Sequence, residues 1–217
     1  ADSFYKASVY FPSGIMLDSV MIRKILPGRN TSEILVVTFT DGIFICNTIT
    51  KAIHKFLQKE ETKNSIATAV AWDGNVYTAS NKKLYKLFPT EQVVLENPLL
   101  DDIRSLLVWK HQLWAASPKT GVVVITNNSS LEAKPFTVGS TDVGVLAADK
   151  QNNLWIGTRD KGIVIIEPKK FSILYSFSDA ANQAEWPKKF TLSLFKDRQN
   201  NMWVGSSGGG FSILMDK

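Results

Sequence analysis

The chain has 217 residues, of which 44% are hydrophobic and 11% aromatic, and its formal net charge is +5. This composition provides enough apolar side chains for a buried core and excludes a disordered chain. The sequence contains no run of about 18 apolar residues, and its first residues lack the pattern of a secretion signal. We therefore expect a soluble chain that makes no membrane contact of its own.

The residue types that bind metals and nucleic acids are scarce or scattered. The one cysteine, Cys46, lies in an apolar run, where a small buried hydrophobe is the expected role. With a single thiol, His54 and His111 cannot provide the ligand spacing of a zinc site. Lysine and arginine are spread along the chain instead of forming a stripe. We expect no metal, no cofactor and no nucleic-acid partner.

An internal repeat organises the chain. Five copies follow one another, and the residues at one shared position are Leu35, Tyr77, Trp114, Trp155 and Trp203. The spacing of about forty residues is the length of a four-stranded propeller blade. Valine, isoleucine, threonine and aromatic residues dominate each copy, and turn signals interrupt it every few residues, which argues against helices.

The repeat predicts an all-β fold, a β-propeller of about five four-stranded antiparallel blades in a single domain, residues 1–217. In chain order the expected blades span about 20–60, 64–100, 102–139, 142–178 and 189–217. Residues 4–11 form an apolar strand with no blade of its own. We expect this N-terminal strand to pair with the last blade near residues 211–215, because closure would remove an exposed sheet edge.

The last two copies show the pattern of a blade most clearly. A polar turn of residues 149–153 has hairpin chemistry, since Asn and Asp accept left-handed backbone angles. The next strand, which contains Trp155, is apolar throughout, as expected of a sheet covered on both faces. Gly157 and Gly205 lie two residues after Trp155 and Trp203. We expect them to mark positions where two backbones approach too closely for a side chain.

The segments DKQNNLWIGTRDKG and DRQNNMWVGSSGGG, which begin at Asp149 and Asp197, resemble the two-component regulator propeller repeat. Asn152 and Asn200 stand where that family prefers glycine. The resemblance implies the periplasmic or extracytoplasmic sensor part of a bacterial two-component signalling system. It also implies a role in signal transduction, often in response to products of carbohydrate breakdown.

Candidate binding residues lie in turns that a propeller gathers on one face. The long connection before residue 190 breaks the repeat and places an aromatic ring beside cations, a suitable platform for a sugar or an acidic ligand. The alternative is that its Trp186 plugs the base of the loop. The predicted ligand-binding residues are Arg159, Asp160, Lys161, Trp186, Lys188, Lys189 and Lys119.

The sequence favours a sensory, ligand-binding propeller with no catalytic residues. The expected ligand is an oligosaccharide or an acidic molecule. One alternative is a scaffold for a protein partner or a homodimer. Another is a propeller lyase or glycosidase, for which the expected inner strands offer mainly apolar side chains, and no nucleophile motif accompanies either histidine.

Overall fold

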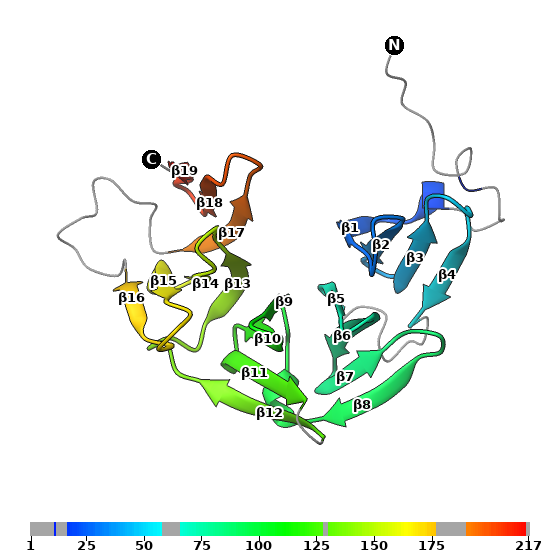
Figure 1. Cartoon of the computed structure of the whole chain (residues 1–217), viewed down its shortest axis with the longest axis horizontal. Helices are drawn as coiled ribbons and strands as arrows, with labels where there is room; N and C mark the ends of the chain where they lie inside the picture. The colour runs from blue at the N-terminus through cyan, green and yellow to red at the C-terminus, as the bar shows by residue number, and fades with distance from the viewer. Residues whose placement is uncertain (1–10, 12–16, 58–65, 128–129, 177–189, 216–217) are drawn as a thin grey trace, which may run out of the picture. The chain divides into compact units, whose positions relative to one another are not determined.

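The computed structural model describes residues 11, 17–57, 66–127, 130–176 and 190–215. These residues form nineteen β-strands and two three-residue 3-10 helices (Figure 1). The all-β fold that we expected is confirmed, because the strands form five antiparallel sheets that are the blades of a propeller. No helix in the described ranges has the length and apolar character needed to cross a membrane.

Each blade consists of strands that follow one another along the chain, and all neighbouring strands are antiparallel. Blade 1 contains β1 (Ile22–Pro27), β2 (Glu33–Thr38), β3 (Ile43–Asn47) and β4 (Ile53–Phe56). Blade 2 contains β5 (Ala69–Trp72), β6 (Asn75–Ser80), β7 (Lys83–Lys86) and β8 (Gln92–Glu96). The helix η1 (Leu17–Ser19) precedes β1.

Blade 3 follows the helix η2 (Pro98–Leu100) and contains β9 (Ser105–Trp109), β10 (Gln112–Ser117), β11 (Gly121–Asn127) and β12 (Leu131–Phe136). Blade 4 contains β13 (Val143–Ala148), β14 (Leu154–Thr158), β15 (Ile163–Ile166) and β16 (Ile173–Ser176). Blade 5 has three strands in the described residues, namely β17 (Thr191–Lys196), β18 (Met202–Ser206) and β19 (Gly210–Leu214).

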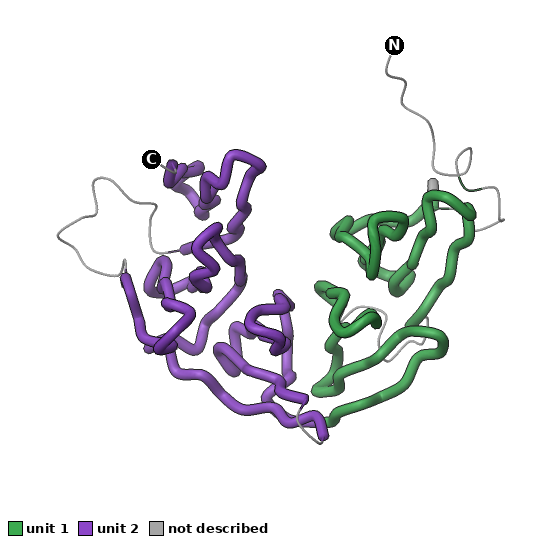
Figure 2. The backbone as a smooth tube through the Cα atoms, viewed as in Figure 1, with its two compact units in different colours: residues 1–96 green, residues 97–217 purple. Residues whose placement is uncertain are grey.

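The chain divides into two compact units (Figure 2). Unit 1 is residues 1–96 and holds blades 1 and 2, whereas unit 2 is residues 97–217 and holds blades 3, 4 and 5. The five residues at the shared repeat position all lie on the second strand of their blade, as the repeat predicted; they are Leu35, Tyr77, Trp114, Trp155 and Trp203.

Packing between successive blades forms the core of each unit. In unit 1, Leu35 and Ile45 of blade 1 share a cluster with Val76 of blade 2. In unit 2, Trp114 of blade 3 packs in one cluster with Leu154 and Ile156 of blade 4. The next cluster joins Trp155 to Met202 and Val204 of blade 5. Burial of both faces of the inner blades explains why their second strands lack the alternation of a half-exposed sheet.

An aspartate organises the first hairpin turn in blades 4 and 5. The Asp149 carboxylate accepts hydrogen bonds from the Asn153 backbone N (2.8 Å), the Asn153 side-chain amide (2.8 Å) and Trp155 Nε1 (3.0 Å). Asp197 accepts the same three bonds from Asn201 and Trp203. The bond from Trp203 is the main reason that the Asp197 pKa lies below its usual value. The turn and the buried strand behind it are therefore fixed together.

The asparagines that replace the family's glycine occupy left-handed backbone positions. Asn152 has φ of 64° and Asn200 has φ of 68°. Asparagine is among the few residues with a side chain that adopt this region at low cost. The substitution therefore preserves the turn that the glycine would make.

Residues 4–10 of the expected N-terminal closing strand lie outside the described residues, so its pairing with β19 stays a prediction. Phe11 is described and belongs to no strand. Its side chain is 7% exposed and packs with Leu17 of η1 and with Val36, Phe44 and Cys46 of blade 1. The end of this segment thus covers a face of the first blade.

Gly157 is required by close packing between blades 4 and 5. A Cβ at this position would lie 2.5 Å from Val145 Cγ1 and 2.7 Å from Thr191 Cγ2. The neighbours are methyl groups of β-branched side chains, which have little freedom to move. The close approach predicted from the sequence is confirmed, although side chains and not backbones cause it.

We predict that Gly157→Ala lowers the free energy of unfolding by about 1–3 kcal/mol, because the new methyl group overpacks the contact between the blades. Denaturant unfolding followed by circular dichroism would measure the change. Gly144→Ala is the matched control, since its Cβ would meet only the Thr191 carbonyl oxygen at 3.9 Å. Equal stability of the two variants would contradict the packing argument.

We also predict that Asp149→Ala destabilises the fold by roughly 1–3 kcal/mol, because Trp155, 1% exposed, would keep a buried N–H without an acceptor. Gln151→Ala tests an exposed side chain of the same turn and should change stability by less than about 0.5 kcal/mol. Thermal unfolding of both variants checks the prediction. A melting temperature of Asp149→Ala equal to that of the original chain would contradict it.

Candidate functional site

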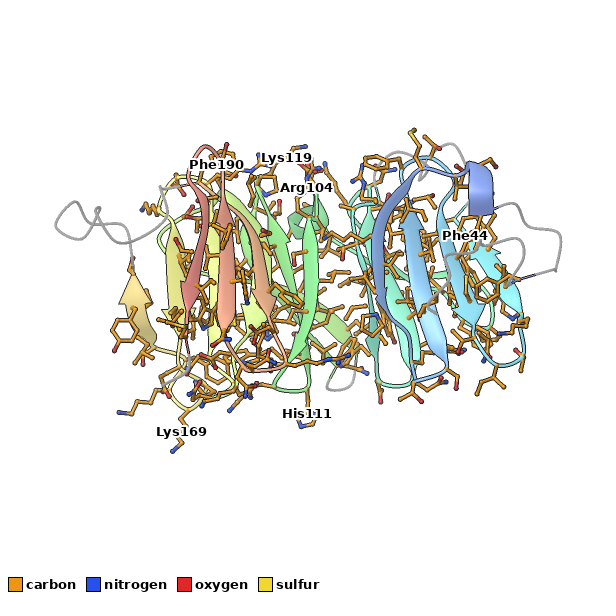
Figure 3. All side chains as sticks on the ribbon, turned by 90° about the horizontal axis from the view of Figure 1, so that it is seen from above. Phe44, Arg104, His111, Lys119, Lys169 and Phe190 are labelled. Atoms are coloured by element: carbon orange, nitrogen blue, oxygen red, sulfur yellow. The ribbon has the colours of Figure 1, made fainter. Side chains whose placement is uncertain are left out.

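The strands of unit 2 run between two ends that carry different residues. Arg104, Lys119 and Phe190 lie at one end, and His111 and Lys169 lie at the other (Figure 3). We call the first end the turn face. It carries the turns after the second strands and the connections between the blades, in residues 99–104, 118–120, 139–142, 159–161, 190 and 207–209.

Backbone hydrogen bonds join these turns to the connection that precedes each blade. The Arg159 N–H donates to the Asp142 carbonyl (2.9 Å), and the Ser207 N–H donates to the Phe190 carbonyl (3.0 Å). The Thr120 hydroxyl donates to the carbonyl of Leu99 in η2 (2.7 Å). The turn that follows a second strand is thus held beside the segment that enters the same blade.

Arg159 links an acidic and an aromatic side chain of the turn face. Its Nε lies 3.9 Å from Asp142 Oδ1, and both side chains are more than one-third exposed. Its guanidinium carbon lies 5.3 Å from the centre of the Phe190 ring. The guanidinium therefore sits at a junction of charged, aromatic and solvent-exposed groups.

The neighbouring turn residues also have polar partners. The Ser140 hydroxyl donates a hydrogen bond to the Asp160 carboxylate. Lys161 Nζ donates to the Gly139 carbonyl. Asp160 and Lys161 are both exposed, so a ligand could exchange these bonds for its own.

A second group of charges surrounds the entry to blade 3. Lys119 Nζ lies 3.3 Å from Asp101 Oδ2, and Arg104 lies 2.8 Å from Asp102 Oδ1. The Ser117 hydroxyl donates to the Asp101 carbonyl and accepts from the Lys119 backbone N. The predicted site residue Lys119 is therefore part of an ordered turn, with its side chain 59% exposed.

The described residues of the turn face carry equal numbers of positive and negative side chains. Its four cations are Arg104, Lys119, Arg159 and Lys161, and its four carboxylates are Asp101, Asp102, Asp142 and Asp160. Three of the cations lie within 4 Å of one of these carboxylates. Among the described residues the face thus carries as many carboxylates as cations, instead of the basic surface that its lysines and arginines alone would suggest.

Of the predicted site residues, the structure brings Arg159, Asp160 and Lys161 together in one turn and places Lys119 in the corresponding turn of blade 3. Trp186, Lys188 and Lys189 lie outside the described residues. Sequence reasoning missed the contribution of Phe190 and the pairing of Arg104, Lys119 and Arg159 with aspartates. The repeat did contain a sign of this pairing, because an aspartate precedes the first strand in both blade 3 (Asp102) and blade 4 (Asp142).

Reactive and metal-ligating side chains do not cluster in the described part of the chain. No group of three or more His, Cys, Asp and Glu side chains that could hold a metal ion occurs there. Cys46 is fully buried on β3, and burial raises the pKa of its thiol to about 11. This thiol is therefore protonated at neutral pH and is a poor nucleophile.

We predict that Cys46 does not react with a thiol reagent at pH 8 while the chain is folded, because the thiol is both protonated and inaccessible. Reaction with Ellman's reagent, followed by absorbance, should release one equivalent of product only after denaturant is added. Rapid release from the native chain would show that β3 opens readily or that the thiolate is stabilised.

A family model described as two component regulator propeller matches residues 137–160 and 186–208. The resemblance found in the sequence is thereby confirmed for the copies that begin blades 4 and 5. The first match contains Arg159 and Asp160 of the turn face. No curated protein sequence matches the chain.

Several solved structures are similar to the chain. One is the extracellular domain of a proposed hybrid two component system, BT3049, from B. thetaiotaomicron, with 20% identity and a TM-score of 0.66 over 88% of this chain and 26% of that one. Another is the extracellular domain of a proposed one component system, BT4673, from the same organism, with 15% identity and a TM-score of 0.69 over 89% of this chain and 27% of that one.

A third similar structure is a catalytically inactive virginiamycin B lyase from Staphylococcus aureus with quinupristin, at 13% identity and a TM-score of 0.66. The similarity covers 93% of this chain and 72% of the lyase. At these identities the similarities establish the fold. The chain spans about a quarter of the length of the two extracellular domains. It is a propeller that resembles extracellular domains of two component systems.

Proposed function

We propose that the chain is a non-catalytic, ligand-binding propeller of an extracytoplasmic sensor, and that its turn face binds a neutral ligand rich in hydroxyl groups, such as an oligosaccharide. The observation that carries this proposal is the equal number of cations and carboxylates among the described residues of the face. An anionic ligand would gain from the cations but would be repelled by as many carboxylates. A neutral ligand with hydroxyl groups can donate to the carboxylates and accept from the cations.

The exposure of the ion pairs supports the same proposal. Pairs between exposed side chains contribute only about 0–1 kcal/mol, so a ligand can replace them at little cost. Here Lys119 is 59% exposed and Arg104 is 42% exposed. Hydrogen bonds to charged groups are stronger than those between neutral groups, which favours the exchange. Phe190 adds an aromatic surface beside Arg159.

The placement of the histidines supports a role in binding over catalysis. His111 lies at the end of unit 2 opposite the turn face (Figure 3), and His54 belongs to β4 of unit 1. Asp142 pairs with Arg159, and Asp160 accepts the Ser140 hydroxyl. The similarity to extracellular domains of two component systems supports the sensor role.

Isothermal titration calorimetry with neutral oligosaccharides and with oligouronides of the same length tests the proposal. We expect binding of at least one neutral oligosaccharide, and we expect Arg159→Ala and Asp160→Asn each to weaken it by about tenfold, the effect of roughly 1.4 kcal/mol. Lys169→Ala, which changes a lysine at the opposite end of unit 2, is the control and should bind as the original chain does (Figure 3).

Binding of the oligouronides without the neutral sugars would show that the cations dominate the face and would reject the neutral ligand. Equal binding by the original chain and by both turn-face variants would place the site elsewhere. Circular dichroism of each variant ensures that any loss of binding comes from the site and not from unfolding.

A further inference from the structure

The end of unit 2 opposite the turn face includes three turns of blades 3 and 4. They are residues 110–111 between β9 and β10, residues 149–153 between β13 and β14, and residues 167–172 between β15 and β16. His111 and Lys169 mark this end in Figure 3. We call these three turns the lysine face, because their charged side chains are four lysines and two carboxylates: Lys110, Lys150, Lys169, Lys170, Asp149 and Glu167.

The lysine face differs in charge from the turn face. All four of its lysines are exposed, and with histidine counted as neutral its formal net charge is +2. Three of the four cations of the turn face lie within 4 Å of a carboxylate. Within the described ranges, by contrast, the ammonium groups of Lys110, Lys169 and Lys170 have no carboxylate oxygen within 4 Å. These cations can therefore meet an external anion without first leaving a partner.

The two carboxylates of the lysine face are engaged within their own turns. Asp149 accepts three hydrogen bonds from its hairpin. Glu167 accepts from the backbone N of Lys169 (3.1 Å) and from the backbone N of Lys170. The bond from Lys169 is the main reason that the pKa of Glu167 lies below its usual value. Both carboxylates thus use part of their hydrogen-bonding capacity inside the protein.

Exposed apolar side chains lie beside these lysines. Phe171 follows Lys170 and is 39% exposed, and Ile173 at the start of β16 is 52% exposed. Lys110 Nζ lies 5.8 Å from the centre of the Phe171 ring. The same ring packs edge-on against Trp109, with ring centres 5.4 Å apart, which holds it at this end of the blade. Lysines together with exposed aromatic and aliphatic side chains are typical of surfaces that contact lipid.

We propose that the lysine face binds the surface of an anionic lipid bilayer. Its lysines lie among the headgroups in this arrangement, and Phe171 and Ile173 reach the boundary with the acyl chains. Peripheral contact of this kind needs no apolar segment of membrane-spanning length, whose absence was the basis of the expectation from the sequence. The proposal goes beyond the ligand-binding role of the turn face and does not depend on it.

The residue types favour a lipid surface over an acidic protein as the partner. All four cations are lysines, whereas protein interfaces are enriched in arginine and depleted in lysine. An ammonium group is a compact point charge, so it is attracted to an anionic bilayer without a fixed partner geometry. The lysines also come from three separate turns. Mobile headgroups can gather at each of them, but a protein would need carboxylates at matching positions.

Cosedimentation with lipid vesicles tests the proposal. We expect the chain to bind vesicles of phosphatidylcholine that contain about one-third phosphatidylglycerol at ~50 mM salt, and not to bind vesicles of phosphatidylcholine alone. Raising the salt to ~500 mM should release most of the bound chain, because the exposed charges are then screened.

Charge reversal on the lysine face should weaken this binding. Lys169→Glu is expected to raise the dissociation constant for the anionic vesicles by about tenfold, because it removes a cation and adds a repelling carboxylate. The matched control is Lys134→Glu, which makes the same change on β12, outside the lysine face, at a side chain that is 71% exposed. This control should bind the vesicles as the original chain does.

The apolar contribution has its own variant. Ile173→Ser should weaken binding to the anionic vesicles by about threefold, because a polar side chain gains less from the boundary with the acyl chains. Ile49→Ser is the matched control, since Ile49 is 73% exposed in the turn between β3 and β4 of unit 1. All four variants change exposed side chains and should fold, which circular dichroism checks.

Absence of binding to the anionic vesicles at low salt would overturn the proposal. Equal binding by Lys169→Glu and the original chain would also overturn it, as would equal binding to both kinds of vesicle. Binding to polyglutamate without binding to vesicles would assign the lysine face to an acidic protein and reject the lipid. The oligosaccharide titrations probe Arg159 and Asp160 at the other end of unit 2, so failure of one proposal is distinguishable from failure of the other.

Discussion

The structure depends on one constraint, which is that an inner blade is apolar on both faces and buries both against the layers on either side. A free-standing sheet of four strands with two apolar faces would expose both to water. Stacking successive blades removes this cost, and the large side chain on each second strand fills the space between the sheets. Trp114 and Trp155 are each 1% exposed because the following blade lies against them. Stability in such an array belongs to the contacts between neighbours as much as to any single blade.

The sequence predicted this architecture well because the repeat is a direct consequence of the constraint. In blade 1, Leu35 stands where blades 3, 4 and 5 have a tryptophan, yet it is fully buried at the same place on the second strand. Residue size can vary while burial is retained, so the hydrophobic pattern survives where the motif does not. The left-handed angles of Asn152 and Asn200 were likewise readable, since the turn restricts which residues can occupy them.

The candidate site was less predictable, because it depends on distances between residues that are far apart in the sequence. Lysine and arginine in the turns suggested an attraction to acidic ligands. The structure places Asp101 beside Lys119 and Asp142 beside Arg159, a pairing that the sequence alone did not indicate. Local sequence preferences also did not predict the two-residue turn between β9 and β10 of blade 3, where Lys110 and His111 both have positive φ. This turn contains no aspartate that could accept a hydrogen bond from the Trp114 side chain. Trp114 Nε1 is buried and has no hydrogen-bond partner among the described residues.

The balanced charges of the turn face have a consequence for how molecules reach it. A face that carries one sign of charge draws oppositely charged molecules from a distance, and added salt slows their arrival. Alternating charges a few ångströms apart cancel beyond the screening length of about 8 Å at physiological ionic strength. The paired charges of the described residues therefore do not steer an approaching molecule. The part of the face that these residues form should therefore add little salt dependence to the rate at which a molecule arrives.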